Sequence, residues 1–400
     1  MAPTLSRSPD TRTRGPFANV RPSYLILLTA APFVVYLFLT ADSYQRALRF
    51  LLPGVGTTAF VTVVAYIAAS ALGLLLAGMQ MIRLGKRTVL SFALAGAVLL
   101  AGSVVAFTRP HVHYSLVGAE GGLVAIIRGT PQHLSDTIRG GEYPGAGDPL
   151  SVRAVTDVEA ALERLASGVT TAAFLPTVDA PAGVPVIWET SFLPPDVRGV
   201  AVFLTVFGVF ALALAAAAYS SGMHPLRIVS ELYVDLMRGI PMLVVILYVG
   251  FPLQGAVREA TGGLIDMSRV TRGIVGISLG YAAYMAEIFR AGIEAVSSGQ
   301  VEASRSLGLS NWQTARYVVL PQALRIVVPP LGNEFIAMLK DTSLLSVLSV
   351  RDITQRAREF QAATFEVFPP FNTVAVMYIV LTLMASSLAK TAERRASWTR

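Results

Sequence analysis

Residues 297–321 read SSGQVEASRSLGLSNWQTARYVVLP, a short polar stretch that lies between two long apolar runs. Its residue types predict two short helices joined by a turn. Gly308 suits the left-handed conformation that ends a helix, and Ser310 with Gln313 three residues later matches a capping box that begins the next helix. Pro321 lies inside the following apolar run, where it would kink the helix or free a carbonyl group. We therefore expect a stiff, exposed helix–turn–helix that projects from a membrane.

The rest of the chain is dominated by apolar runs. Of its 400 residues, 54% are hydrophobic and only 14% are charged, and the mean hydropathy is +0.59. This composition excludes a disordered chain, a coiled coil and an ordinary cytosolic enzyme. Because a helix needs roughly 20 apolar residues to cross a bilayer, we expect an all-α polytopic membrane protein with about eight transmembrane helices. The expected spans are 24–41, 55–82, 89–107, 199–219, 232–251, 272–290, 315–340 and 371–389.

Residues 108–198 differ from the apolar runs in composition. They contain ten acidic and six basic residues, with many Pro and Gly. Apolar residues recur at helical spacing over Asp157–Leu165, and Thr170–Leu175 has the composition of a strand. We expect this segment to be a small α/β insert outside the membrane. The remainder of the chain is basic, but its charges are scattered between apolar runs, which favours lipid head groups over nucleic acid as their partner.

The distribution of Lys and Arg predicts the orientation. With the N-terminus inside, fifteen of these residues lie in inner segments against eight in the short outer segments, which favours two cytoplasmic termini in a multi-pass plasma-membrane protein. The expected domains are a cytoplasmic tail (1–23), three N-terminal helices (24–107), the insert (108–198), a five-helix core (199–390) that contains a cytoplasmic loop (291–314), and a second tail (391–400).

Several kinds of catalytic chemistry are excluded by missing residues. The chain has no Cys, so a thiolate metal site, an iron–sulfur cluster and a Cys nucleophile are excluded. The nucleotide-binding pattern G-x-x-x-x-G-K-[ST] and the hydrolase pattern H-E-x-x-H are absent. Of its four His residues, His111 and His113 are spaced as strand neighbours but have no further ligands nearby, and His133 and His224 are far apart in sequence, so no metal site is expected. We expect a protein that is not an enzyme and holds no cofactor or metal of its own.

The polar stretch resembles the cytoplasmic loop of binding-protein-dependent ABC importer permeases. The pattern of that family is EAA, three residues, Gly, nine residues, Ile, one residue and Leu-Pro. This chain keeps every spacing, with Ser304 and Val318 as its two departures from the pattern. The residues that match the loop are Glu302, Ala303, Ser304, Gly308, Leu320 and Pro321.

Four flanking segments resemble the polar amino-acid uptake branch of this family. They are Tyr233–Pro241, Tyr281–Gly292, Pro321–Pro330 and Asn333–Leu344. The resemblance implies an importer permease that works by alternating access. It also implies three protein partners: an ABC ATPase subunit that holds ATP and Mg, a second permease that is identical or a sister, and an extracytoplasmic amino-acid-binding protein. The resemblance leaves open whether helix 55–82 or helix 199–219 fills the first core position.

The resemblance also assigns a role to the matching loop. Its first helix would lie in a groove of the ATPase and act as a ball joint between that subunit and the membrane helices. Glu302 would pair with a basic group of the ATPase, Ala303 and Ser304 would keep the helix narrow enough to dock, and Gly308 would set the turn. Alternatively, Glu302 is only a solvated residue of an exposed helix.

Ionisable residues within or beside spans are candidates for a substrate pathway, because burying them in a membrane is costly. An amino acid needs donors for its carboxylate and an acceptor for its ammonium group. The candidates are Glu287, Glu334, Lys340, Asp341, Thr342 and Ser343. As adjacent helical residues, Lys340 and Asp341 point to different faces and need not pair with each other. The alternative is that these residues have no role in transport and only end a helix at the outer surface of the membrane.

Two other functions remain as alternatives. An ion-gradient-driven secondary transporter would have carboxylates in the middle of its spans and broken helices in paired positions. Glu287 and Glu334 are the only residues that hint at such a transporter. A membrane sensor would bind a ligand with its outer domain and signal inward, and its function would not depend on Glu302.

Overall fold

The computed structural model describes residue 32 and residues 35–144, 149–261 and 263–397. The chain divides into two compact units. One is contiguous, Arg83–Ile228, and is called the inserted unit below; the other combines Met1–Ile82 with Val229–Arg400 and is called the split unit. The expected tail 1–23 and ten of the 18 residues of the expected first span, 24–41, lie outside the described residues.

The split unit is entirely helical in its described part. Residues 35–40 are helical, and α2 (Asp42–Gln80) follows them; α7 (Pro225–Gly239) begins at the boundary with the inserted unit. The helices that follow are α8 (Met242–Tyr248), α9 (Gln254–Ala260), α10 (Arg269–Glu294), α11 (Ser298–Ser306), α12 (Asn311–Thr314), α13 (Leu320–Asp341), α14 (Ile353–Thr364) and α15 (Phe368–Ser397). π-Helical turns occupy Val249–Leu253 and Ala315–Val319, and a 3-10 helix occupies Thr342–Leu348.

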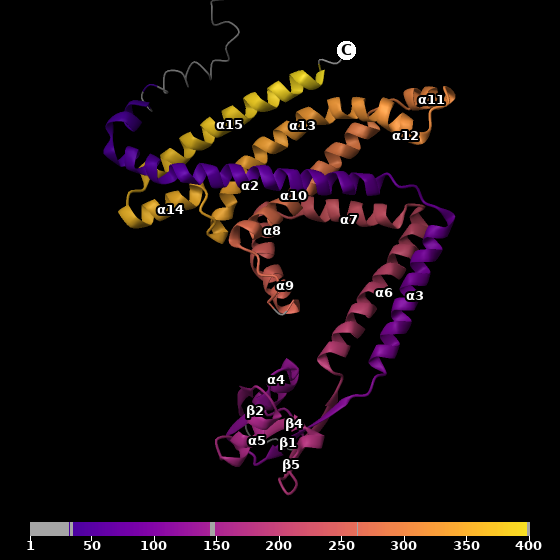
Figure 1. Cartoon of the computed structure of the whole chain (residues 1–400), viewed down its shortest axis with the longest axis vertical. Helices are drawn as coiled ribbons and strands as arrows, with labels where there is room; N and C mark the ends of the chain where they lie inside the picture. Colours follow the sequence, from indigo (N-terminus) through magenta and orange to yellow (C-terminus); the bar gives the residue numbers. More distant parts are fainter. Residues whose placement is uncertain (1–31, 33–34, 145–148, 262, 398–400) are drawn as a thin grey trace, which may run out of the picture. The chain divides into compact units, whose positions relative to one another are not determined.

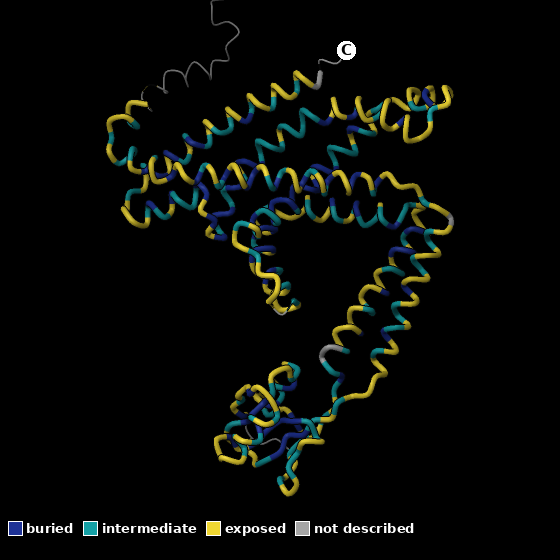
Figure 2. Tube along the Cα trace, in the orientation of Figure 1, coloured by how far each residue is buried: buried dark blue, intermediate teal, exposed yellow. Residues whose placement is uncertain are grey.

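Helix α2 packs along α10 through a row of small residues. Ala65, Ala69, Gly73 and Ala77 are all buried, and a Cβ atom added at Gly73 would lie 2.5 Å from the Cβ of Met285 in α10. Small residues at this four-residue spacing let two helix backbones approach closely. The start of α2 packs on α14, where Ala47 and Leu51 join buried residues of α14 and α15. Helix α2 is therefore part of the core of the split unit (Figures 1 and 2).

Side-chain to backbone hydrogen bonds tie the helices around α2 together. The Ser230 hydroxyl of α7 donates to the Leu76 carbonyl of α2 at 2.9 Å, and the Tyr66 hydroxyl of α2 donates to the Leu331 carbonyl of α13 at 3.1 Å. The Tyr233 hydroxyl donates across from α7 to α10 at 2.7 Å. These bonds satisfy polar groups that would be costly to leave unpaired in an apolar surrounding.

The expected span 232–251 is wrong, because the helix breaks at Pro241. Helix α7 ends at Gly239 and α8 begins at Met242, with Pro241 in an extended conformation (φ −58°, ψ 136°). Proline lacks the amide hydrogen that a helix interior needs and disfavours the helical conformation of the residue before it. The apolar stretch that could span a membrane is Met242–Ala260 instead.

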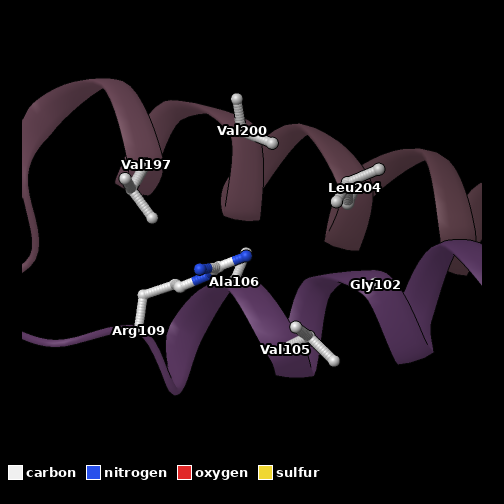
Figure 3. Close-up of a pocket in the computed structure, with 7 residues that line it drawn as sticks. All are labelled: Gly102, Val105, Ala106, Arg109, Val197, Val200 and Leu204. Atoms are coloured by element: carbon white, nitrogen blue, oxygen red, sulfur yellow. The ribbon is translucent and has the colours of Figure 1, made fainter.

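The inserted unit contains a helical hairpin. Its arms are α3 (Lys86–Phe107) and α6 (Pro195–Ser221). They approach closely at Gly96, where a Cβ atom would lie 2.8 Å from Leu212. The Ser103 hydroxyl donates to the Ala201 carbonyl at 3.1 Å. At the Arg109 end, an open pocket of about 460 Å³ with mostly apolar walls lies between the two arms (Figure 3).

The inserted unit also contains a mixed five-stranded sheet. Its strands are β1 (Val112–Gly118), β2 (Leu123–Ile127), β3 (Ser151–Val155), β4 (Ala172–Pro176) and β5 (Val186–Phe192). The strand order is β3-β2-β4-β1-β5. Strand β2 runs parallel to β3 and β4, whereas β1 runs antiparallel to β4 and β5. Two helices, α4 (Gln132–Gly140) and α5 (Val158–Ala166), connect the parallel strands.

Five described helices are long and apolar enough to cross a membrane. They are Asp42–Gln80, Arg87–Phe107, Val197–Ser221, Met242–Ala260 and Phe368–Arg395. The compact units also differ from the expected core of 199–390. Helix α6 pairs with α3 in the inserted unit, whereas α2 packs with α10, α13, α14 and α15. Hydropathy alone could not separate these two apolar helices, because their packing partners lie far away in the sequence.

Candidate functional site

The polar stretch forms the expected pair of short helices. Helix α11 ends at Ser306, and Gly308 adopts φ +82°, which is the left-handed conformation that a glycine accepts without strain. Helix α12 begins with a complete capping box. The Gln313 amide donates to the Ser310 hydroxyl at 3.3 Å, and the Ser310 amide donates to the Gln313 side chain at 2.8 Å. These local signals confirm the predicted turn.

Ser304 holds the two short helices together. It is only 5% exposed, and Thr314 of α12 is 3% exposed. The Ser304 hydroxyl lies 3.0 Å from the Thr314 hydroxyl and 2.7 Å from the carbonyl of Val301 in its own helix. An alanine at this position would pack but could not make the bond to α12. The serine therefore adds a polar tie between α11 and α12.

The pair of helices is also tied to α13. The Gln322 side chain of α13 donates to the Gln300 side chain of α11 at 2.5 Å. A side chain at Gly292, near the end of α10, would collide with Val327 of α13. The two long helices that lead into and out of the loop are thus in contact at its base, so that α11, α12 and the start of α13 form one connected body.

A π-helical turn, Ala315–Val319, joins α12 to α13 directly before Pro321. Since Pro321 has no amide hydrogen to donate to the preceding turn, the regular α-helical ladder is interrupted there. A widened turn at this point matches the expectation that the proline would disturb the helix, although α12 and α13 continue through it.

This loop exposes a carboxylate and several large apolar side chains. Glu302 and Ala303 of α11 are exposed. Leu307 is 81% exposed and Trp312 is 72% exposed, and Tyr317 is also exposed. Exposed apolar patches with polar neighbours are typical of protein interaction sites.

Replacing Ser304 with alanine is expected to loosen α11 against α12, because the buried Thr314 hydroxyl loses its partner. The expected cost is about 1–3 kcal/mol, and it should appear as faster hydrogen–deuterium exchange of the amides over 298–314. Ser306→Ala is the control, since Ser306 lies in the same helix but is exposed. The double variant Ser304→Ala/Thr314→Val should recover part of the loss, because no buried hydroxyl is left unpaired. Equal exchange in Ser304→Ala and Ser306→Ala would show that the tie contributes nothing.

The substrate-pathway candidates of α13 lie near its end. Asp341 is the last residue of α13, and its carboxylate accepts a hydrogen bond of 2.8 Å from the Tyr281 hydroxyl of α10. Lys340 is exposed, so the two adjacent residues point to different faces as expected. Thr342 is fully buried and donates to the Leu339 carbonyl at 2.7 Å, and Ser343 is half-buried in the same 3-10 helix.

Glu334 and Glu287 have different surroundings. Glu334 is half-buried and lies seven residues before Asp341, so the two carboxylates share a face of α13. Glu287 instead accepts a hydrogen bond of 3.0 Å from Arg238 at the end of α7 and is paired with Arg290 in its own helix. Six residues separate Glu287 from Tyr281, which is about 9 Å along the helix axis. Glu287 is thus held in an ion-pair cluster away from the group around Asp341.

Tyr281 was not among the residues singled out from the sequence. It is 4% exposed and contacts Asp341 from a position 60 residues earlier. It does stand at the start of the conspicuous segment Tyr281–Gly292, but no local pattern indicates its partner.

Comparison with known proteins gives one family match and several relatives. Residues 210–398 match the family described as "Binding-protein-dependent transport system inner membrane component". The probable amino-acid ABC transporter permease protein YckA of Bacillus subtilis (strain 168) is 37% identical over 193 residues, which cover 48% of this chain and 80% of that protein. The glutamine transport system permease protein GlnP of Escherichia coli (strain K12) is 36% identical over 167 residues, which cover 42% of this chain and 74% of that protein.

Solved structures give a partial match as well. A crystal structure described as an amino acid ABC transporter with histidines is 37% identical, covers 47% of this chain and 84% of its own, and aligns with a TM-score of 0.39.

Proposed function

Since the chain belongs to the family of binding-protein-dependent transport system inner membrane components, we propose that it moves amino acids across the plasma membrane by alternating access, driven by a separate ATPase subunit. The protein is a multi-pass membrane component of an ABC importer and not an enzyme. Amino acids are the proposed cargo because relatives named as amino-acid and glutamine permeases are more than a third identical to the chain. The observation that carries the driven mechanism is the exposed, internally tied pair of helices α11 and α12.

The proposed coupling loop transmits force because it is connected at both ends. Glu302 and Ala303 face outward on α11, where a groove of the ATPase would receive them. The bond of Ser304 to Thr314 and that of Gln300 to Gln322 keep α11, α12 and α13 together. Movement of α11 would therefore tilt α13. The remaining loop residues set the course of the backbone and offer no polar side chain to the ATPase. They are Gly308, which ends α11, and Leu320 and Pro321, which begin α13.

The proposed membrane topology has eight spans and places both termini inside. The described helices α2, α3, α6, α10, α13 and α15 and the stretch 242–260 account for seven of them, and residues 24–41 are the eighth. Helix α10 has 26 residues and α13 has 22, which at 1.5 Å per residue is enough to cross roughly 30 Å of hydrocarbon. We propose that α2, and not α6, fills the first core position, and that the sheet of the inserted unit lies outside.

The proposed substrate pathway runs past the end of α13. Asp341 offers an acceptor for an ammonium group, and Lys340, Thr342 and Ser343 offer donors for a carboxylate. Tyr281 orients the Asp341 carboxylate by its hydrogen bond, and Glu334 lies on the same face of α13. Glu287 keeps an ion-pair role beside this pathway, because Arg238 and Arg290 already neutralise it.

The proposed partners follow from this mechanism. An ABC ATPase would hold ATP and Mg and dock on the coupling loop. A second permease would complete the pathway, and an extracytoplasmic binding protein would deliver the amino acid. ATP binding would draw two coupling loops together and open the pathway outward, and hydrolysis would let it return.

The test is ATP-dependent uptake by reconstituted protein. Vesicles that contain this chain, its ATPase and its binding protein should accumulate radiolabelled L-glutamine or L-arginine when ATP is inside. Uptake should continue when ionophores remove proton and sodium gradients. Uptake that stops with the ionophores and ignores ATP would instead establish a secondary transporter, and binding without any uptake would favour a sensor.

A further inference from the structure

The parallel part of the sheet in the inserted unit is covered by one helix on each face. Successive residues of β2 alternate between two apolar clusters. Val124 and Ile126 pack with α4, whereas Ala125 packs with α5. Side chains of a strand point alternately to its two faces, so α4 and α5 lie on opposite faces. This is the arrangement of doubly wound α/β sheets.

The connections that leave the adjacent strands β2 and β4 run to opposite edges of the sheet, to β3 and to β5 respectively. Helix α4 leads from β2 to β3 on one side, and α5 leads from β3 to β4 on the other side. In open α/β sheets, ligands bind in the crevice outside the carboxyl ends of the strands at such a divergence. The loop that follows β2 begins at Arg128, at the carboxyl end of that strand.

A cavity lies beside this loop, between α4 and the strands β2 and β3. Its volume is about 440 Å³, within the range of roughly 300–1,000 Å³ found for small-molecule sites. Aliphatic side chains of β2 and β3 form its apolar floor. Its polar walls consist of Arg128, Thr130, Gln132, Ser135, Asp136 and Arg139.

The charged groups in the cavity are not equivalent. Arg139 is paired with Asp136 at 3.2 Å, whereas Arg128 forms no ion pair with any residue that the structure describes. The Thr130 hydroxyl donates to the Ile127 carbonyl at 2.8 Å, which holds the loop after β2 and leaves the lone pairs of the hydroxyl available. The walls thus offer one free guanidinium group and, from Asp136, one carboxylate.

We propose that this cavity binds an α-amino acid, with Arg128 holding its carboxylate and Asp136 accepting its ammonium group. The ligand is a zwitterion, so its negative carboxylate faces Arg128 and its positive ammonium group faces Asp136. The side chain of the ligand lies on the apolar floor of the cavity. Ser135, half-buried in α4, adds a hydroxyl for the carboxylate. The choice of ligand class rests on the proposed transport function, but this site lies in the inserted unit and is separate from the pathway at Asp341. It gives the protein an amino-acid site of its own in addition to any binding protein.

The test measures equilibrium binding to the full chain in lipid nanodiscs, without ATPase or binding protein. The probes are L-glutamine, L-arginine and agmatine, the last being arginine without its carboxylate. At least one amino acid should bind saturably. Arg128→Ala should raise its dissociation constant about tenfold or more, as the loss of a charge-assisted hydrogen bond does. Asp136→Asn should weaken binding as well, and Arg128→Lys should give an intermediate value.

The matched control is Arg153→Ala. Arg153 lies in β3 between the cavity-lining Val152 and Ala154, so its side chain points to the opposite face of the sheet. This variant removes the same charge and should bind the probes as the parent does.

Four results would overturn the assignment. They are no saturable binding of any probe, equal binding of agmatine and L-arginine, displacement by inorganic phosphate but not by amino acids, and binding that Arg128→Ala leaves unchanged while Asp341→Asn removes it. ATP-dependent uptake is measured separately with the same Arg128→Ala protein. Uptake that does not depend on ATP would refute the proposed transport function. A loss of amino-acid binding while uptake remains ATP-dependent would concern only this cavity.

Discussion

Replacing Gly73 with leucine is expected to lower the free energy of unfolding by about 3 kcal/mol, one of the larger effects in this chain. The reason is contact between backbones: a Cβ atom at position 73 would lie 2.5 Å from the Met285 Cβ, 2.9 Å from the Ala286 amide nitrogen and 3.0 Å from the Ala282 carbonyl oxygen. Backbone atoms cannot turn away as a flexible side chain can, so α2 would have to separate from α10. The measurement is the unfolding midpoint of the purified full chain in detergent.

Gly78→Leu is the matched control for this prediction. Gly78 lies in the same helix, is exposed, and has no atom within 4 Å of an added Cβ. It carries the same change in helix propensity and hydrophobicity. If Gly73→Leu were no less stable than Gly78→Leu, then α2 would not be packed on α10, and α6 would remain the candidate for the first core position.

Reversing the charge of Glu302 to lysine is expected to abolish uptake and to weaken the ATPase complex by at least about thirtyfold. The estimate corresponds to about 2 kcal/mol, the lower end of the cost of breaking a buried charge pair at an interface. Glu302 is exposed on α11, and its side chain makes no hydrogen bond or ion pair with any residue that the structure describes. Folding should therefore be unaffected. Pull-down of the ATPase and uptake into vesicles measure the two effects.

Glu259→Lys is the control for the charge reversal. Glu259 is likewise an exposed helical glutamate, in α9, and the proposed topology places it on the other side of the membrane. It should leave ATPase binding and uptake near the parent level. Normal uptake by Glu302→Lys would remove the role assigned to this side chain and would revive the sensor as an explanation.

The coupling loop could be predicted from the sequence because its signals are local. Its signals are a capping box, a glycine that ends a helix and a proline. Each of them acts within a few residues, so the local sequence is enough to predict its effect. The break at Pro241 was missed for the opposite reason. Hydropathy averaged over 232–251 ignores a single residue, yet the missing amide of that residue ends α7 and lets α8 begin in a new direction.

Contacts between distant segments could not be predicted in the same way. Two apolar helices, α2 and α6, look alike by composition, and their packing partners differ: α2 packs on α10 at Gly73, whereas α6 packs on α3. Similarly, Asp341 looked like an isolated acid at a helix end, because its partner Tyr281 belongs to another helix. Patterns along the chain gave the candidate residues, and packing between helices decided which of them meet.

The hydrogen bond between Ser230 and the Leu76 carbonyl has a consequence for how such a chain can be assembled. It joins the two stretches that flank residues 83–228, so the chain leaves and re-enters the split unit at neighbouring points. The 83–228 segment carries its own apolar clusters and contributes none of the buried residues at the centre of its host. It is therefore an independently packed insertion, and a short linker could bridge the gap that its excision would leave.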